Sequence, residues 1–326
     1  MKKRTILSIL LLLVFHPIVF SQVTDAESKL RTIVTDTIPG WKKGGILGLS
    51  LAQTSLTNWA SGGQNSLAIN GLISVFANYK KDNIAWDNSL DVGYGLLKQG
   101  KNSDYMKTDD KFDFMSKFGK KATKNFFYTA LLNVRTQMTV GKDYAKDTSK
   151  ISNFLAPLYV IGALGMDYKP NSYFGAFIAP LTGKITWVND QELANAGAFG
   201  VQGAKYDNLG AILELGKKSK SEFGGYVRII YSRNDFKNEL LKNVSFTTKA
   251  DLFSNYLHNP QFVDVSWETQ VALQVNKYIR VNVNTHLIWD KDILIPIDTN
   301  NDGTMDDSKA LVQFKEILGV GLSYKF

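Results

Sequence analysis

The segment DTNNDGTMDDSK, residues 298–309, carries oxygen-bearing side chains at the spacing of a calcium-binding loop. Its candidate ligands are Asp298, Asn300, Asp302 and Asp306. Gly303 follows the first three, so alternate oxygens could wrap a hard cation around a sharp turn. Lys309 departs from the pattern, because it takes the twelfth position, where a bidentate acidic ligand is expected. The sequence predicts a weak calcium site, with a solvated acidic turn as the alternative.

Two histidines beyond residue 21, His258 and His286, are candidates for acid–base chemistry. His286 falls on the polar face of a predicted strand, where Asp264 or Asp290 could complete a dyad with it. A histidine held in a hydrogen-bond network is the alternative, and no His-x-Ser pattern occurs in the sequence. We therefore predict that the protein is not an enzyme, with a hydrolase as the alternative.

The tripeptide Gly62-Gly63-Gln64, within SLTNWASGGQNS, resembles the loop with which release factors hydrolyse peptidyl-tRNA. A glycine pair could also cradle a phosphate, but no helix start or P-loop lysine follows this one. Glycines suit a turn for backbone reasons alone. We predict a connection between two strands, in which Trp59 either packs within the loop or folds inward.

Residues 1–21 have the three parts of a secretory signal peptide. These parts are the basic residues Lys2, Lys3 and Arg4, an apolar run from Thr5 to Phe15, and Ser21 at the predicted cleavage position. An exported chain does not meet the ribosome, which excludes the release-factor interpretation.

The composition excludes several kinds of site. The sequence has no cysteine, so it has no disulfide, no thiolate metal site and no lipid-modified cysteine. Without the signal peptide, the 38 lysines and arginines fall to 35, against 30 aspartates and glutamates. This excess is too small to predict binding to nucleic acid.

Strand-length segments with a side-chain period of two follow one another from residue 45 onward. In VDVSWETQVALQV, for example, Val263, Val265 and Trp267 share one face, and Asp264 and Ser266 the other. The predicted strands are 45–55, 66–80, 84–97, 110–119, 126–140, 157–169, 172–188, 207–216, 222–233, 261–275, 278–289 and 311–326.

The connections between these segments alternate in length. The long ones are exemplified by 98–109, 141–156, 189–206, 234–260 and 290–310, and the tight ones are KKDN, KKATKN, KPN, KKSKS and NK. This alternation is typical of a transmembrane antiparallel up-and-down barrel with short periplasmic turns and long outer loops. We predict an all-β barrel of about 12 strands over residues 45–326, preceded by a periplasmic segment over 22–44. A soluble exported β-protein is the alternative.

The segment ILGVGLSYKF has the pattern of a C-terminal insertion signal. It alternates apolar residues with glycine and polar residues, and Tyr324 and Phe326 stand at its end. This resembles the last strand by which bacterial outer-membrane barrels are recognised for insertion. Aromatic residues also gather near other predicted strand ends, as at Tyr79, Trp86 and Trp289, where amphipathic rings can lie at the headgroup level.

The predicted inward faces carry both signs of charge. The lumen-facing polar residues are Asp87, Asp91, Arg135, Arg228, Glu268, Arg280 and His286, together with Asp113, Lys117, Asp167 and Glu214. Buried charge without a partner is prohibitively costly, so these groups are either paired across the lumen or hydrated. Pairing predicts an occluded barrel and hydration predicts a pore, and 12 strands are compatible with both.

Several segments together resemble an exported Bacteroidetes family catalogued only as a domain of unknown function. They are WKKGGILGLSLAQTSLTNWASGGQNSLAINGL, WDNSLDVGYGLLKQG, LAPLYVIGALGMDYKPN, LTGKITWVNDQELANAGAFGV and KADLFSNYLHNPQFVDVSWE, from about Gly40 to Trp289. The resemblance implies an outer-membrane-type barrel in a Gram-negative cell, and no established activity.

We therefore expect an outer-membrane protein that either passes a small polar solute or is a structural or assembly component of that membrane. A hydrolase at the barrel rim, of protease or lipase type, is the alternative. The expected partners are outer-membrane lipid and the barrel-assembly machinery, with no nucleic acid. No cofactor is expected beyond the weak calcium site.

Overall fold

The computed structural model describes residues 39–56, 64–100, 103–144, 149–239, 241–276, 279–297, 299 and 307–325. The predicted signal peptide, Trp59 with Gly62 and Gly63, and the four candidate calcium ligands lie outside the described residues. Phe326 also lies outside them, and Tyr324 is described only as the backbone partner of Leu47.

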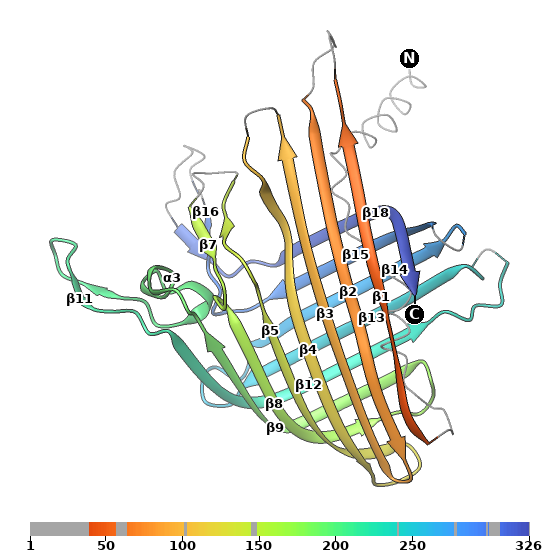
Figure 1. Cartoon of the computed structure of the whole chain (residues 1–326). Coiled ribbons are helices and arrows are strands. Elements are labelled where there is room, and N and C mark those ends of the chain that lie inside the picture. The colour runs from red at the N-terminus through yellow and green to blue at the C-terminus, as the bar shows by residue number, and fades with distance from the viewer. Residues whose placement is uncertain are drawn as a thin grey trace, which may run out of the picture.

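Twelve antiparallel strands of the described chain form one closed barrel (Figure 1). They are β1 (Gly40–Thr54), β2 (Ser66–Lys81), β3 (Ile84–Gln99), β4 (Met106–Lys121), β5 (Phe126–Thr136), β8 (Leu158–Tyr168), β9 (Phe174–Trp187), β12 (Ser219–Arg233), β13 (Val244–Asn255), β14 (Val263–Gln274), β15 (Ile279–Trp289) and β18 (Gln313–Lys325). Each strand pairs with its neighbour in the sequence, and β1 pairs with β18 from Ile46–Lys325 to Leu49–Leu322. The predicted all-β up-and-down barrel is confirmed.

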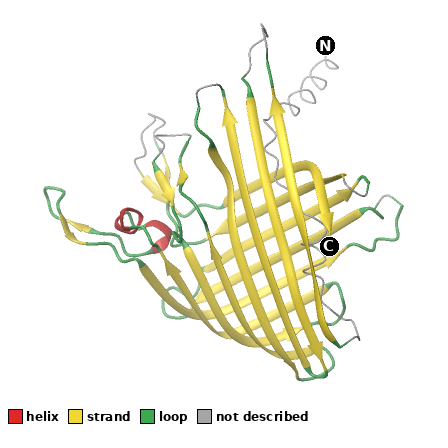
Figure 2. Ribbon diagram, viewed as in Figure 1, coloured by secondary structure: helices red, strands yellow, loops and turns green. Residues whose placement is uncertain are grey.

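The two ends of the barrel differ in their connections. At one end the connections are 82–83, 122–125, 169–173, 234–243 and 275–278. At the other end, longer connections carry the hairpins β6 (Gly141–Lys142) with β7 (Lys150–Ser152), β10 (Lys205–Tyr206) with β11 (Ile212–Glu214), and β16 (Ile295–Ile297) with β17 (Asp307–Lys309). The short helix α3 (Gln191–Asn195) and the 3-10 turn η1 (Ala198–Gly200) lie there too (Figure 2). The end with short connections is periplasmic in barrels of this kind.

The predicted strand order is wrong in one region. Residues 207–216 form no barrel strand, because they belong to the outer connection that carries β10 and β11. KKSKS is therefore at the outer end, where it leads into β12. The missing strand is β13, which lies within the predicted loop 234–260. The first barrel strand also begins at Gly40, five residues before the predicted boundary.

The outer surface of the barrel is apolar. Large exposed side chains on it include Leu47, Leu49, Leu51, Ile73, Leu132, Leu164, Ile178, Ile185, Ile229, Leu273, Phe314, Leu318 and Val320. Aromatic rings gather near both ends. Trp41 packs against Tyr79 and Trp86 at the periplasmic end, and Phe262 packs against Trp289 at the outer end. An apolar band between aromatic girdles is the surface that a lipid bilayer requires of a barrel.

In the part of the chain that the structure describes, no helix is both long enough and apolar enough to cross a membrane.

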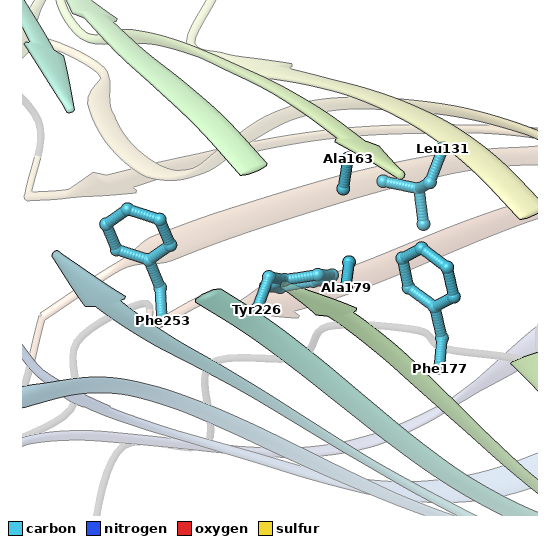
Figure 3. Close-up of a cluster of buried hydrophobic side chains, with 6 residues drawn as sticks. All are labelled: Leu131, Ala163, Phe177, Ala179, Tyr226 and Phe253. Atoms are coloured by element: carbon cyan, nitrogen blue, oxygen red, sulfur yellow. The ribbon is translucent and has the colours of Figure 1, made fainter. Parts of the chain in front are cut away.

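Part of the barrel interior is also apolar. The lumen apolar cluster consists of Leu131 on β5, Ala163 on β8, Phe177 and Ala179 on β9, Tyr226 on β12 and Phe253 on β13. Its side chains project from facing strands toward one another (Figure 3). All are buried, so packed apolar side chains occupy this side of the lumen at the level of the cluster.

A bulge brings β8 and β9 close together beside this cluster. The register between the two strands shifts between Leu164 and Met166, which leaves Gly165 against the backbone of β9. A Cβ atom added at Gly165 would lie 2.5 Å from Ala179 Cα and 2.7 Å from the carbonyl carbon of Ile178. Only a residue without a side chain fits between the two backbones.

We expect Gly165→Ala to destabilise the barrel by about 1–3 kcal/mol, the usual cost of forcing extra atoms into a packed site. Gly162→Ala is the matched control, because it lies on the same strand and an added Cβ meets nothing within 4 Å. Urea titration of the two refolded proteins, followed by tryptophan fluorescence and the heat-dependent gel shift, measures the difference. Equal midpoints for both variants would contradict this account of the bulge.

Candidate functional site

Charged side chains from five strands meet inside the barrel. This central charge cluster consists of Lys111 and Asp113 on β4, Arg135 on β5, Arg228 on β12, Lys249 and Asp251 on β13, and Glu268 on β14. The strand registers put opposite charges face to face: Asp113 with Arg135, Arg228 with Asp251, and Lys249 with Glu268. Neighbouring strands therefore neutralise each other's inward charges.

The pair between Arg228 and Asp251 has the best geometry of these. Arg228 Nε donates to Asp251 Oδ1 at 2.5 Å, and Nη2 donates to Oδ2 at 3.1 Å. The Tyr226 hydroxyl donates to the same carboxylate at 2.6 Å. All three residues are buried. A bidentate, fully hydrogen-bonded pair of this kind is the arrangement in which a buried charge is tolerated.

Glu268 extends this pairing across the lumen. It lies 3.1 Å from Lys249 Nζ on the neighbouring strand, and also 3.9 Å from Lys111 Nζ and 3.9 Å from Arg135 Nη2. Five strands separate β14 from β4 in either direction around the barrel, so Glu268 and Lys111 come from opposite walls. The carboxylate thus forms a charge bridge over the full width of the lumen.

The bridge divides the lumen into two halves. One half, walled by β5, β8, β9, β12 and β13, contains the lumen apolar cluster. The other half is walled by β15, β18, β1, β2 and β3, and we call it the polar half. Its inward positions carry short polar residues and glycines, among them Ser50, Asn70, Asn282, Asn284 and Gly95.

A cavity of about 330 Å³ lies at the outer end of the lumen, lined mostly by strands of the apolar half and also by Ile288 of β15 and Gln313 of β18. Its walls include Arg135, Tyr159, Lys184, Asp264 and Ser266, and Phe199 of η1 also lines it. A cavity of this volume is large enough for a small molecule. Three carboxylates on one wall of the cavity share Lys184 as their partner. Its Nζ lies 2.7 Å from Asp264 Oδ2, 3.5 Å from Glu222 and 3.8 Å from Asp290.

A second set of ion pairs lies toward the periplasmic end. Lys117 Nζ is 2.7 Å from Asp167 Oδ2, and Lys169 Nζ is 3.3 Å from the same atom. Lys169 also binds Asp87 at 3.1 Å, although two strands, β5 and β4, lie between β8 and β3. Ion pairs therefore join strands that are not neighbours at this level too.

The outer connections are joined over the barrel mouth by Asp190. Its Oδ1 caps α3 by accepting from the backbone of Glu192 at 3.0 Å and Leu193 at 3.2 Å. Its Oδ2 binds Asn153 and Lys150 of the connection 137–157, both at 2.7 Å. Burial alone would raise the pKa of Asp190, but the bonds from Lys150, Asn153 and the helix backbone outweigh it and lower the pKa to about 2.

The described residues do not form the dyad of His286 with Asp264 or Asp290 that the sequence left as an alternative. His258 is exposed on the outer connection 256–262, and its Nδ1 bonds with the Leu257 carbonyl. His286 faces the lumen, where Nε2 lies 2.9 Å from Ser266 Oγ and 3.9 Å from Glu268. Asp264 and Asp290 bind Lys184 instead. A catalytic triad needs a carboxylate on the other imidazole nitrogen, and here Glu268 and Ser266 approach the same one.

The structure places the predicted lumen residues as follows. Asp91, Arg228, Glu268 and Arg280 are buried inside the barrel, and Asp87, Arg135 and His286 are partly buried there. Asp91 accepts a hydrogen bond from Ser74. The prediction that Glu214 faces the lumen is wrong, because Glu214 belongs to β11 of an outer hairpin, where it is exposed and binds Lys205.

The sequence interpretation missed much of the central charge cluster. Lys249 and Asp251 were assigned to a loop, because β13 has polar side chains, Ser245 and Thr247 among them, along its inward face. Period-two alternation in VSFTTKADLF was the signal that could have revealed this strand. Lys111 and Lys184 were missed because a lysine in a strand is usually solvated.

The chain was compared with known families and structures. A family model described as a protein of unknown function (DUF3078) matches residues 51–141, which confirms the resemblance to a family of unknown function over that segment. No curated protein matches the chain.

Among solved structures, the chain is similar to an outer-membrane channel from Pseudomonas putida F1, with 8% identity over 89% of this chain and 97% of that one, and a TM-score of 0.39. It is also similar to the translocator domain of the autotransporter NalP from Neisseria meningitidis, with 10% identity over 90% and 91% of the two chains, and a TM-score of 0.33. Likenesses this distant say nothing of what the chain carries or binds.

The class of the protein follows from its own geometry. A closed sheet satisfies every backbone hydrogen bond without an edge, which is what a lipid environment demands. The outward face is apolar, aromatic girdles flank it, and the charges lie inside. The protein is a transmembrane β-barrel of the outer-membrane type.

We expect Asp190→Ala to loosen the outer connections. Loss of a helix cap costs about 1 kcal/mol, and Lys150 and Asn153 lose their partner as well. Limited proteolysis of residues 188–218 should accelerate at least about fivefold, in proportion to the opened population. Glu192→Ala is the control, since this exposed residue contacts Lys150 but caps nothing. Equal cleavage of both variants would show that Asp190 does not hold the connections.

The stabilisation by Asp190 should also depend on pH. The pKa is lowered from 3.8 to about 2 in the folded protein, so the stabilisation is complete above about pH 4 and is lost as the pH falls through 2. Pepsin cleavage, normalised to an unfolded reference protein, should differ between wild type and Asp190→Ala at pH 5 and converge near pH 2. A difference that stays constant across this range would contradict the assignment.

Proposed function

We propose that the protein is a selective outer-membrane pore for a small polar solute, narrowed by the charge bridge at Glu268. The observation that carries the proposal is the position of this carboxylate between Lys249 on its own side and Lys111 and Arg135 on the opposite wall. Because these charges are paired, the lumen is narrowed, as the pairing alternative predicts, and a general-diffusion pore is excluded. A purely structural barrel, however, needs no polar interior at all.

The distribution of polar groups favours transport over a structural role. The polar half contains buried amide and hydroxyl groups, and a cavity lies at the outer end of the lumen. A structural barrel could fill both regions with apolar side chains at lower cost. Polar groups line the interior, which suits a small polar solute, and the charge bridge leaves too little room for large molecules.

We infer a non-enzymatic role. Ser266 and His286 are in contact, but the carboxylate near them does not orient the imidazole as a hydrolase requires. Outer-membrane lipid around the apolar band and the barrel-assembly machinery during insertion are the partners that we propose. The interior charges are mutually paired, and nothing in their arrangement favours nucleic acid.

We expect Glu268→Gln to open the lumen. Removing the carboxylate leaves Lys249, Lys111 and Arg135 without their shared partner, so mutual repulsion drives their side chains apart. An interaction of about 1.4 kcal/mol corresponds to a tenfold change in population, so a wide conductance level should be occupied about ten times more often than in wild type. Recording of the refolded protein in planar bilayers in potassium chloride measures this occupancy.

Glu239→Gln is the matched control for this experiment. Glu239 is exposed in a periplasmic turn and pairs only with nearby Lys242 among its described ion pairs. Its removal changes the net charge by the same amount without touching the lumen. If neither wild type nor Glu268→Gln shows discrete current steps while both retain the heat-dependent gel shift, the protein is a structural component and the pore proposal is wrong.

A further inference from the structure

The polar half of the lumen contains buried polar atoms without a hydrogen-bond partner among the residues that the structure describes. They are Ser50 Oγ on β1, Asn70 Nδ2 on β2, Gln270 Oε1 on β14, and Asn282 Oδ1 with both amide atoms of Asn284 on β15. The side chains are 1%, 5%, 8%, 2% and 9% exposed, respectively. These residues stand on the bridge strand β14 and on the wall that continues from it through β15 and β18 to β1 and β2.

The strand registers arrange these residues in rows. Gln270 is opposite Asn284 across β14 and β15. Ser50 is opposite Asn70, and Asn70 is opposite Gly95 on β3. A Cβ atom at Gly95 would collide with Asn70 Oδ1 and Thr108 Oγ1. Because Gly95 has no side chain, the Asn70 amide can lie over the backbone of β3 along this wall.

Unpartnered polar atoms are expensive inside a protein. Each such group costs about 1–3 kcal/mol, and most buried polar groups in folded proteins have a partner. The other half of the same barrel differs, because its inward face is filled mainly by the lumen apolar cluster and by paired charges, with Arg135 Nε as an unpartnered atom on β5. Amides gathered on one wall are explained if molecules in transit supply their missing hydrogen bonds.

The chemistry of the wall indicates which molecules these are. Asn70 and Asn284 present unmet donors, and Gln270, Asn282 and Asn284 present unmet acceptors. A hydroxyl group can accept a hydrogen bond from the unmet donors and donate one to the unmet acceptors. A carboxylate can only accept, and an ammonium group can only donate. Charges of both signs face this half. Arg280 and Lys315 stand on β15 and β18, and Asp87 and Asp91 stand on β3. The wall therefore does not present a single sign of charge that would select cations or anions.

Resting on the proposed function, we infer that the polar half is the solute path and that it selects small uncharged hydroxylated molecules. The charge bridge forms one boundary of the path, and the wall from β15 to β3 forms the other. The solute exchanges its hydrogen bonds with water for hydrogen bonds with successive amides. Chloride meets only the donors of the wall and potassium only its acceptors, so each ion replaces less of its hydration than a hydroxylated molecule does, which keeps the ionic conductance of wild type low.

Swelling of proteoliposomes in isosmotic glycerol, arabinose and glycine betaine tests this inference. Wild type should pass glycerol and arabinose faster than betaine, which has no hydroxyl group. The double variant Asn282→Leu with Asn284→Leu should slow glycerol and arabinose about tenfold, the effect of two lost hydrogen bonds. Asn282→Ser with Asn284→Ser keeps hydrogen-bonding groups and should retain the wild-type rates.

Val283→Leu is the control on the same strand, because residue 283 has the opposite parity to the inward pair. If the leucine double variant passes glycerol at the wild-type rate, or if wild type passes betaine as fast as arabinose, the inference is wrong. Conductance of Glu268→Gln distinguishes this failure from that of the proposed function. Current steps together with unchanged swelling would overturn the path alone, whereas loss of both would overturn the pore.

Discussion

The bridge between Glu268 and the cations of the opposite wall is the interaction on which the interior of this barrel depends. A carboxylate inside a protein surrounded by lipid must be neutralised nearby. Glu268 has Lys249 as its register partner, yet it also approaches Lys111 and Arg135 from the far side. Because the bridge spans the lumen, each half can be built differently. One half is packed with apolar side chains, and the other retains amides and glycines.

The membrane and the lumen impose opposite requirements on each strand. The outward face must be apolar over its whole length, as Leu47, Leu49 and Leu51 are on β1. The inward face is free to be polar wherever pairing or hydration compensates. Strict alternation follows from the strand period of two. It explains why the fold class and the general inward charge pattern were predictable, and why Arg228 and Glu268 could be placed inside from the sequence alone.

The same logic explains where the sequence interpretation was wrong. Along β13, inward Lys249 and Asp251 alternate with outward Thr248 and Ala250, which are weakly apolar. The strand therefore resembles a polar loop. Residues 207–216 contain Leu209, Leu213 and Leu215 and resemble a strand, but these side chains are exposed on an outer connection. Local hydrophobicity identifies a membrane strand only when its outward residues are strongly apolar. Whether a weaker segment joins the barrel depends on its pairing with other strands, which a local pattern does not show.

The candidate site was still less predictable, because its function depends on which walls face each other. The sequence identifies Asn282, Asn284 and Arg280 as one polar face, but it does not show that Ser50 and Asn70 continue that wall after the barrel closes. Closure through β1 and β18 joins residues more than two hundred positions apart into one surface. The position of the bridge then decides that this surface lies on the polar side of the lumen and not beside the lumen apolar cluster. Selectivity in such a barrel is a property of the closed sheet, since no single strand contains the path.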